Sequence, residues 1–218
     1  MRQRKPPCSP PPEQAQIARI NGVFGGSGTG KTAYVIKQIK ADKPDRLFIW
    51  DTLGEFAKKG MGTACFTMLD VAVWTAGRRY AIAYQPKGDE KAMRKQFDMF
   101  CKIAFAAGQH GPVTFVAEEL TDVTNASHAL EGWRRVSVMG RHRGFTVYGM
   151  SQSPAWVDKR FTGNCTKVRT GRLVEVPHAK RMSETLGVPY RKIMELPDLH
   201  YIEKDMRTGA VERGVLTF

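Results

Sequence analysis

Eight residues near the amino terminus constrain the fold more than any other part of the chain. They fit the pattern G-x-x-x-x-G-K-[ST] without a mismatch and are Gly25, Gly26, Ser27, Gly28, Thr29, Gly30, Lys31 and Thr32. Residues 17–24 before them mix β-branched and aromatic side chains and predict a buried strand, whereas residues 33–40 have the apolar spacing of a helix. Strand, glycine loop and helix in this order place backbone N–H groups around phosphate oxygens. The sequence therefore predicts a nucleoside triphosphate site.

The two residues that end this loop predict which ligands it takes. Lys31 supplies a positive charge for the β- and γ-phosphates, and the Thr32 hydroxyl can bind Mg²⁺. The first turn of the following helix adds the positive end of its dipole. We therefore expect ATP and Mg²⁺ as the cofactors.

Composition narrows the partners and the compartment. The chain has 218 residues and a formal net charge of +13, from 34 basic and 21 acidic residues, which favours a polyanion such as nucleic acid or an anionic membrane surface. No run of 18 apolar residues and no apolar leader is found, so we expect neither a transmembrane helix nor a secretory signal. Cys8, Cys65, Cys101 and Cys165 lack C-x-x-C spacing, which argues against zinc and indicates reduced thiols.

The rest of the chain predicts an α/β fold, a mostly parallel sheet flanked by helices. Buried strands are expected at 47–50, 80–84, 113–117 and 144–150, and helices at 89–108 and 127–141. Strands that alternate with helices favour a parallel sheet. Towards the carboxyl end we expect a strand at 167–176, a helix at 178–187 and a hairpin of 200–204 with 210–218 that turns at 207–209.

We expect three parts along the chain. Residues 1–16 carry five prolines and three basic residues and predict an extended tail, either a basic arm that grips DNA or a neighbouring subunit, or a passive leader. Residues 17–175 form the ATP-binding core. Residues 176–218 form a helix and hairpin extension of the same domain.

An acidic pair follows one of the apolar strands. Residues 113–117 run directly into Glu118 and Glu119, the Walker B pattern in which the first carboxylate holds Mg²⁺ through water and the second polarises the attacking water. We assign Glu118 to the metal and Glu119 to the water. The first residue is usually aspartate, and the additional methylene of Glu118 leaves open which glutamate takes which role.

Polar residues at both ends of the strand at 144–150 complete the predicted site. Gln152 follows the strand, where an amide can reach the γ-phosphate and distinguish a triphosphate from a diphosphate. Four arginines precede the strand, and they either supply an arginine finger to an adjacent subunit, contact DNA phosphates or form a solvated basic face. These four residues are Arg134, Arg135, Arg141 and Arg143.

With these motifs in this order, the chain resembles the FtsK–HerA superfamily of DNA-translocating P-loop ATPases over residues 17–175. The segment from Asp51 to Phe56 looks like the family's D-x-x-G-E-[YF], and residues 118–120 are similar to its D-E-L. The spacing from Arg141 to Gln152 matches R-x-x-G, an apolar strand and Q, although Ser153-Pro154 lacks the arginine of Q-R-P. By this resemblance the family's arginine falls on Arg141, with Arg143 in reserve.

The small size of the chain looks most like the genome-packaging ATPases of tailless, membrane-containing icosahedral viruses of the tectivirus type. That resemblance implies a hexameric ring with ATP between subunits and double-stranded DNA in the pore. It also implies partners among capsid or packaging-vertex proteins and, through them, the viral inner membrane. The expected location is the host cytoplasm or the packaging vertex of the virion. DNA contacts are expected in one basic segment if it faces the pore: Lys87, Lys91, Arg94 and Lys95.

Three alternatives remain open. A Zot-like assembly ATPase of filamentous phages has a similar arginine- and histidine-rich segment, but those proteins usually carry a membrane span. A small nucleotide kinase would need a lid with catalytic arginines, for which Arg78 and Arg79 are candidates. A nucleotide-binding assembly factor without turnover would accommodate the missing Walker B aspartate.

Overall fold

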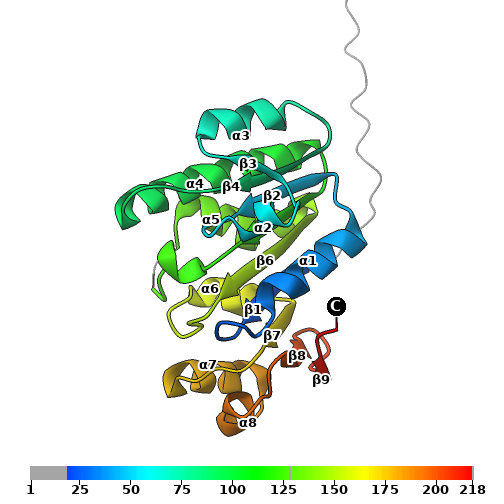
Figure 1. The fold of residues 1–218 in the computed structure, drawn as a ribbon, viewed down its shortest axis with the longest axis vertical. Coiled ribbons are helices and arrows are strands. Elements are labelled where there is room, and N and C mark those ends of the chain that lie inside the picture. The colour runs from blue at the N-terminus through cyan, green and yellow to red at the C-terminus, as the bar shows by residue number, and fades with distance from the viewer. Residues whose placement is uncertain (1–18, 128, 218) are drawn as a thin grey trace, which may run out of the picture.

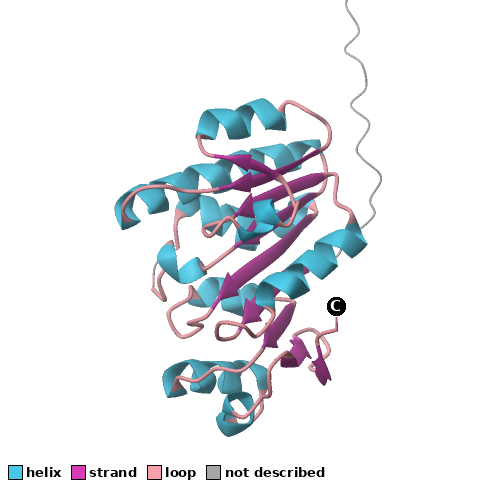
Figure 2. Cartoon of the chain, viewed as in Figure 1, coloured by secondary structure: helices cyan, strands magenta, loops and turns pink. Residues whose placement is uncertain are grey.

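The fold is built on one nine-stranded sheet with helices on both faces (Figures 1 and 2). It is known from a computed structural model that describes residues 19–127 and 129–217. The strands lie in the order β3-β4-β2-β5-β6-β1-β7-β8-β9, and every pair from β3 to β7 is parallel. The last two strands are antiparallel and form the carboxyl-terminal hairpin. The predicted class, a mostly parallel α/β sheet with a hairpin extension, is confirmed.

The elements have the following bounds. The strands are β1 (Arg19–Phe24), β2 (Arg46–Trp50), β3 (Thr63–Cys65), β4 (Tyr80–Tyr84), β5 (Val113–Ala117), β6 (Phe145–Ser151), β7 (Lys167–Thr170), β8 (His200–Asp205) and β9 (Val211–Val215). The helices are α1 (Lys31–Asp42), α2 (Glu55–Lys58), α3 (Met68–Thr75), α4 (Glu90–Ala107), α5 (Glu131–Arg134), α6 (Lys159–Asn164), α7 (Val176–Leu186) and α8 (Tyr190–Met194). None of the helices within the described ranges has the length and apolar character needed to cross a bilayer.

The central strands are buried on both faces, which explains their continuous apolar runs. In β2, Phe48 and Trp50 belong to the cluster that contains the α4 side chains Phe97 and Phe100. The intervening Ile49 belongs to a second cluster, which contains residues of α1. Because successive side chains of a strand point to opposite faces, these two clusters form the two sides of the core.

Parallel pairing brings the predicted site residues to one edge of the sheet. Phe24 at the end of β1 pairs with Ser151 of β6, and Trp50 of β2 pairs with Ala117 of β5. The glycine loop, Glu118 and Gln152 therefore all follow strands at the same carboxyl edge, where ligands of open α/β sheets bind. Arg141 and Arg143 precede β6 and lie at the opposite edge.

Two predicted elements differ from the structure. The helix expected at 127–141 is instead the short α5, a π turn at 135–139 and a 3₁₀ turn at 140–143. The strand expected at 167–176 ends at Thr170, and the backbone groups after it bond to the end of β1 and to the glycine loop. Gly26 N–H donates to the carbonyl of Arg172 at 2.7 Å, and Gly171 N–H donates to that of Phe24.

Two predictions about the ends of the chain are not tested by the structure. The tail at residues 1–16 lies outside the described residues. The division at residue 175 also stays a prediction; β8 and β9 on its carboxyl side extend the same sheet as the core.

Candidate nucleotide-binding site

The glycine loop has backbone angles that only glycine adopts readily. Gly28 has φ of 74° and Gly30 has φ of 85°, both in the left-handed region. Gly30 is also the residue before the first turn of α1, which begins at Lys31. A Cβ at position 30 would meet Leu216 Cδ2 at 2.7 Å, so the carboxyl-terminal segment packs directly against this turn. Glycine here sets both the turn of the loop and the direction of the helix.

Lys31 folds back over its own loop. Its ammonium group donates hydrogen bonds to the carbonyl oxygens of Gly25 at 2.7 Å and Gly26 at 2.9 Å. Burial lowers the pKa of this lysine, while the nearby carboxylates of Glu119 and Glu118 act in the opposite direction. The cation therefore lies inside the loop and beside the acidic pair, where a triphosphate needs it.

Glu118 is buried at the end of β5. Its carboxylate accepts hydrogen bonds from the Thr52 hydroxyl at 3.0 Å and from Leu53 N–H at 3.3 Å. Burial raises the pKa of this carboxyl, and the two hydrogen bonds oppose the rise. A buried carboxylate that keeps unused oxygen lone pairs can ligate a cation directly or through water.

Glu119 is held by the end of β6. Its Oε1 accepts hydrogen bonds from the hydroxyls of Thr121 and Ser151, both at 2.7 Å, and from Gln152 N–H at 3.2 Å. Its backbone lies in the left-handed region, with φ of 45°. Such strain in a non-glycine residue is concentrated at functional sites. The carboxylate is thus fixed between β5 and β6 and not left on a free loop.

One cavity of about 490 Å³ contains most of the predicted residues. It is lined by Lys31, Thr32, Glu118, Glu119 and Gln152 together with Ser27, Gly28 and Gly30 of the loop. The Thr32 hydroxyl and the Glu118 carboxylate supply oxygen donors to the same space, which suits Mg²⁺ better than softer metals. The residues present therefore fit a metal-bound triphosphate, with Thr32 and Glu118 as the protein ligands.

Several lining residues escaped prediction: Thr52, Leu53, Glu55, Lys59, Asp122 and Leu199. Glu55 could have been predicted as a lining residue, because it lies with Asp51 in the segment that resembles D-x-x-G-E-[YF]. The Asp51 carboxylate accepts hydrogen bonds from Phe56 N–H at 3.1 Å and Ala57 N–H at 2.9 Å and so caps the first turn of α2, where Glu55 lies. Leu199 had no such signal, because it is brought in from the carboxyl-terminal extension, with φ of 62°.

The arginines do not reach the cavity of their own chain. None of the four predicted arginines lines it, and the 140–143 turn lies at the other edge of the sheet. Arg143 donates to the Phe105 carbonyl at 2.8 Å, and its guanidinium stacks on the Phe105 ring at 3.9 Å. Arg141 is exposed and donates to the His142 ring at 3.1 Å. Of this pair, Arg141 is the one available to another subunit.

The remaining basic candidates are divided between the two edges. Lys87, Lys91 and Lys95 are exposed near the carboxyl end of β4, and Arg94 pairs with Glu90 at 3.6 Å. Their contact with DNA stays a prediction. Arg78 and Arg79 precede β4 at the opposite edge, so in this chain they do not form a lid over the cavity.

The fold and the cavity together define a P-loop NTPase. The chain is 28% identical to Protein P9 of Pseudoalteromonas phage PM2 over 203 residues, which cover 90% of this chain and 89% of that protein. The genome packaging NTPase B204 from Sulfolobus turreted icosahedral virus 2, solved with AMPPCP, superposes with a TM-score of 0.75 at 14% identity over 94% of this chain and 100% of B204. The scan against protein-family models found no match.

The Zot alternative can be compared in the same way. The N-terminal domain of zonular occludens toxin from Neisseria meningitidis gives a TM-score of 0.51 at 12% identity over 93% of this chain and 95% of that one. The similarity to the packaging NTPase is thus greater than that to the Zot domain. The predicted resemblance is confirmed for the fold, which is that of the P-loop NTPases.

We predict that Lys31→Ala abolishes nucleotide binding or turnover, because no other lining cation replaces the ammonium inside the loop. Binding is measured with a fluorescent ATP analogue and turnover by phosphate release. Lys37→Ala is the matched control, since Lys37 lies on the same helix with its ammonium on the Thr217 carbonyl, outside the cavity. A Lys31→Ala protein with wild-type turnover would contradict the assignment.

Glu118→Gln is expected to raise the melting temperature of the nucleotide-free protein at pH 7 by about 2–4 °C, since it removes a charge that burial disfavours. The pKa of Glu118 is raised in the folded chain, so stability falls as pH rises from about 4.5 through that raised value. The gain should therefore vanish below pH 4.5, and exposed Glu212→Gln should show none. Calorimetry across this range measures it; an equal gain at all pH values would contradict the cause.

Arg143→Ala is expected to destabilise the fold by about 1–2 kcal/mol, because it removes a hydrogen bond and a stacked ring contact. Urea unfolding measures the loss. At a temperature where the variant stays folded, its ATP turnover should match that of the wild type. Lost turnover with unchanged stability would instead transfer the catalytic role from Arg141 to Arg143.

Proposed function

We propose that the chain is an ATP-driven motor that moves double-stranded DNA into a viral capsid. The observation that carries the proposal is the convergence of the glycine loop, Glu118, Glu119 and Gln152 on one cavity. Similarity to phage PM2 Protein P9 and to the packaging NTPase B204 supports the proposed packaging function. The formal charge of +13 suits a polyanionic substrate.

The proposed chemistry follows from the positions of these groups. The loop N–H groups and Lys31 hold the β- and γ-phosphates, and Mg²⁺, when bound by Thr32 and Glu118, neutralises charge on the phosphate oxygens. Glu119 orients the attacking water and accepts its proton, while Ser151 and the Gln152 N–H fix the direction of its carboxylate. The Gln152 amide senses the γ-phosphate.

The proposed motor works as a homo-oligomeric ring, which we expect to be a hexamer. The support is geometric: no arginine of residues 19–127 and 129–217 lines the cavity, and exposed Arg141 lies at the other edge of the sheet. An arginine at the transferring phosphoryl group would then come from a neighbour. Such a ring would lie at the packaging vertex and contact capsid or vertex proteins.

The ATPase rate with and without duplex DNA tests the proposal. Strong stimulation by DNA supports the motor. Stimulation by a nucleoside instead would indicate a kinase, which the position of Arg78 and Arg79 disfavours, and no stimulation at all would indicate an assembly factor without useful turnover. Lys31→Ala serves as the inactive control in every arm.

A further inference from the structure

Helix α3 presents an apolar face to solvent. Leu69 is 73% exposed, Val73 is 67% exposed and Trp74 is 45% exposed, and Phe66 just before the helix is 49% exposed. We call these four residues the α3 patch. Val71 is the helix's only fully buried side chain, so its outer face is as apolar as its inner one. An exposed cluster of this kind marks an interaction surface.

The helix carries almost no charge that could keep this face in water. Its one charged residue, Asp70, is used in a capping box: its carboxylate accepts from Phe66 N–H and Thr67 N–H, and its own N–H bonds the Thr67 hydroxyl. Those hydrogen bonds lower the pKa of Asp70 and hold it at the start of the helix. Asp70 shares the side of the helix that carries Val73 and Trp74, but its carboxylate is bound back to the start of the helix.

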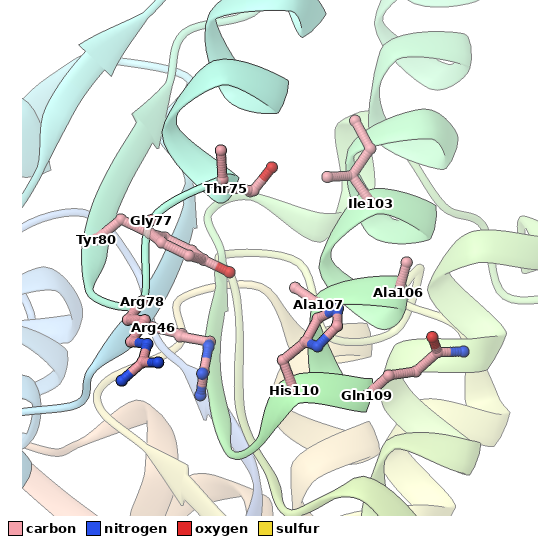
Figure 3. Close-up of a pocket in the computed structure, with 11 residues that line it drawn as sticks. Arg46, Thr75, Gly77, Arg78, Tyr80, Ile103, Ala106, Ala107, Gln109 and His110 are labelled. Carbon is pink, nitrogen blue, oxygen red and sulfur yellow. The ribbon is translucent and has the colours of Figure 1, made fainter. Parts of the chain in front are cut away.

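A basic cavity begins where α3 ends. It has a volume of about 840 Å³ and lies between the α3–β4 loop and the carboxyl end of α4 (Figure 3). Arg46 from β2, Arg78 from the loop and His110 from the turn after α4 line it, with the Tyr80 hydroxyl among them. No acidic side chain lines it, and neither Arg46 nor Arg78 has an ion pair within residues 19–127 and 129–217. A cavity with this lining suits an anion.

We propose that the α3 patch and this cavity dock the protein on an anionic lipid bilayer, with a lipid phosphate in the cavity. The two features are continuous in the chain, since Thr75 at the end of α3 is already part of the cavity lining. Apolar and aromatic side chains beside cations are the combination that binds the interface of anionic membranes.

Two other occupants explain less of this surface. Duplex DNA would use the cations, but its phosphate backbone has no use for the exposed Leu69 and Val73. A second copy of the chain would cover the apolar side chains, but it would bring no phosphate group to the cations of the cavity. A lipid bilayer can bind both the α3 patch and the basic cavity. Because the surface lies away from the nucleotide cavity, its test is separate from that of the proposed motor.

Co-flotation of the full chain with vesicles tests the proposal. We expect binding to vesicles that contain phosphatidylglycerol and much weaker binding to phosphatidylcholine alone. Arg46→Gln with Arg78→Gln should weaken binding about 25-fold, from roughly 1 kcal/mol for each cation. Val73→Gln with Trp74→Gln should weaken it at least about 10-fold. Matched controls are exposed Arg213→Gln on β9 and 60% exposed Trp156→Gln, which should bind as the wild type does.

A second measurement avoids any variant of the surface itself. Trp50 and Trp133 are fully buried, so in a Trp156→Phe protein the only exposed tryptophan within the described ranges is Trp74. Brominated lipid in the anionic vesicles should quench its fluorescence, and soluble glycerol phosphate should not. Absence of quenching would overturn the proposal whether or not the glutamine variants fold.

Other outcomes also decide against it. If the glutamine variants lower the mass of the protein in solution and the wild type does not bind vesicles, the surface joins copies of the chain. If Arg46→Gln with Arg78→Gln weakens duplex DNA binding and leaves vesicle binding unchanged, the cavity serves DNA. If Arg213→Gln weakens vesicle binding as much, the binding depends only on the net charge of the protein. Each of these results contradicts lipid docking.

Discussion

Arg141→Ala is expected to lower ATP turnover by about 10³–10⁵-fold and to leave ATP binding unchanged. The physical reason is that the nucleotide cavity contains Lys31 and Lys59 but no arginine from the described part of its own chain. Arg141 is exposed at the opposite edge of the sheet, where a neighbouring subunit's cavity can receive it. Phosphate release measures turnover, and a fluorescent ATP analogue measures binding.

A mixing experiment separates a finger acting between subunits from one acting within a subunit. Arg141→Ala subunits keep an intact glycine loop, whereas Lys31→Ala subunits keep the arginine. If the arginine acts on a neighbour, mixed rings of these two inactive proteins should regain part of the turnover. Arg160→Ala, an exposed arginine on α6, is the matched control and should turn over ATP at the wild-type rate. Mixtures that stay inactive would contradict action between subunits.

Glu119→Gln is expected to keep ATP binding and to lower hydrolysis by about 10²–10⁴-fold. Glutamine can keep the hydrogen bond from Ser151 but cannot accept the proton of the attacking water. Single-turnover kinetics with radiolabelled ATP separate the loss of chemistry from any change in binding. Full activity in this variant would show that Glu119 is not the general base.

The matched comparison for Glu119 is Ser151→Ala. Ser151 itself only positions the carboxylate, so its removal should cost less than about 10²-fold. A Ser151→Ala variant with the wild-type rate would show that Ser151 supports only the fold.

The parts of the fold that the sequence predicts are those where a local pattern coincides with a tertiary contact. Residues 113–117 form β5 with the expected bounds, because all five side chains are buried and the run is apolar throughout. The glycine loop is predicted for the same reason, since its backbone angles require glycine locally. Where the local pattern and the tertiary contacts favour the same structure, apolar periodicity and turn residues are enough to predict it.

The parts that escape prediction depend on distant contacts. The helix expected at 127–141 breaks up where α5 crosses α4: a Cβ at Gly132 would meet the Asp98 carbonyl oxygen, and no local pattern reveals that approach. Residues 171–172 look like strand but bond to the end of β1 and to the glycine loop. In the site, Leu199 arrives from the far end of the chain. Helix α3 also escapes prediction, because its residues are almost all apolar and so do not show the polar face of a typical surface helix.

The account makes one central claim, that ATP hydrolysis at this cavity moves duplex DNA. Displacement of a third strand from a triplex by the purified protein measures that movement directly. We predict ATP-dependent displacement by the wild type and none by Glu119→Gln at equal ATP occupancy. Rapid ATP hydrolysis by the wild type with the triplex left intact would contradict the claim.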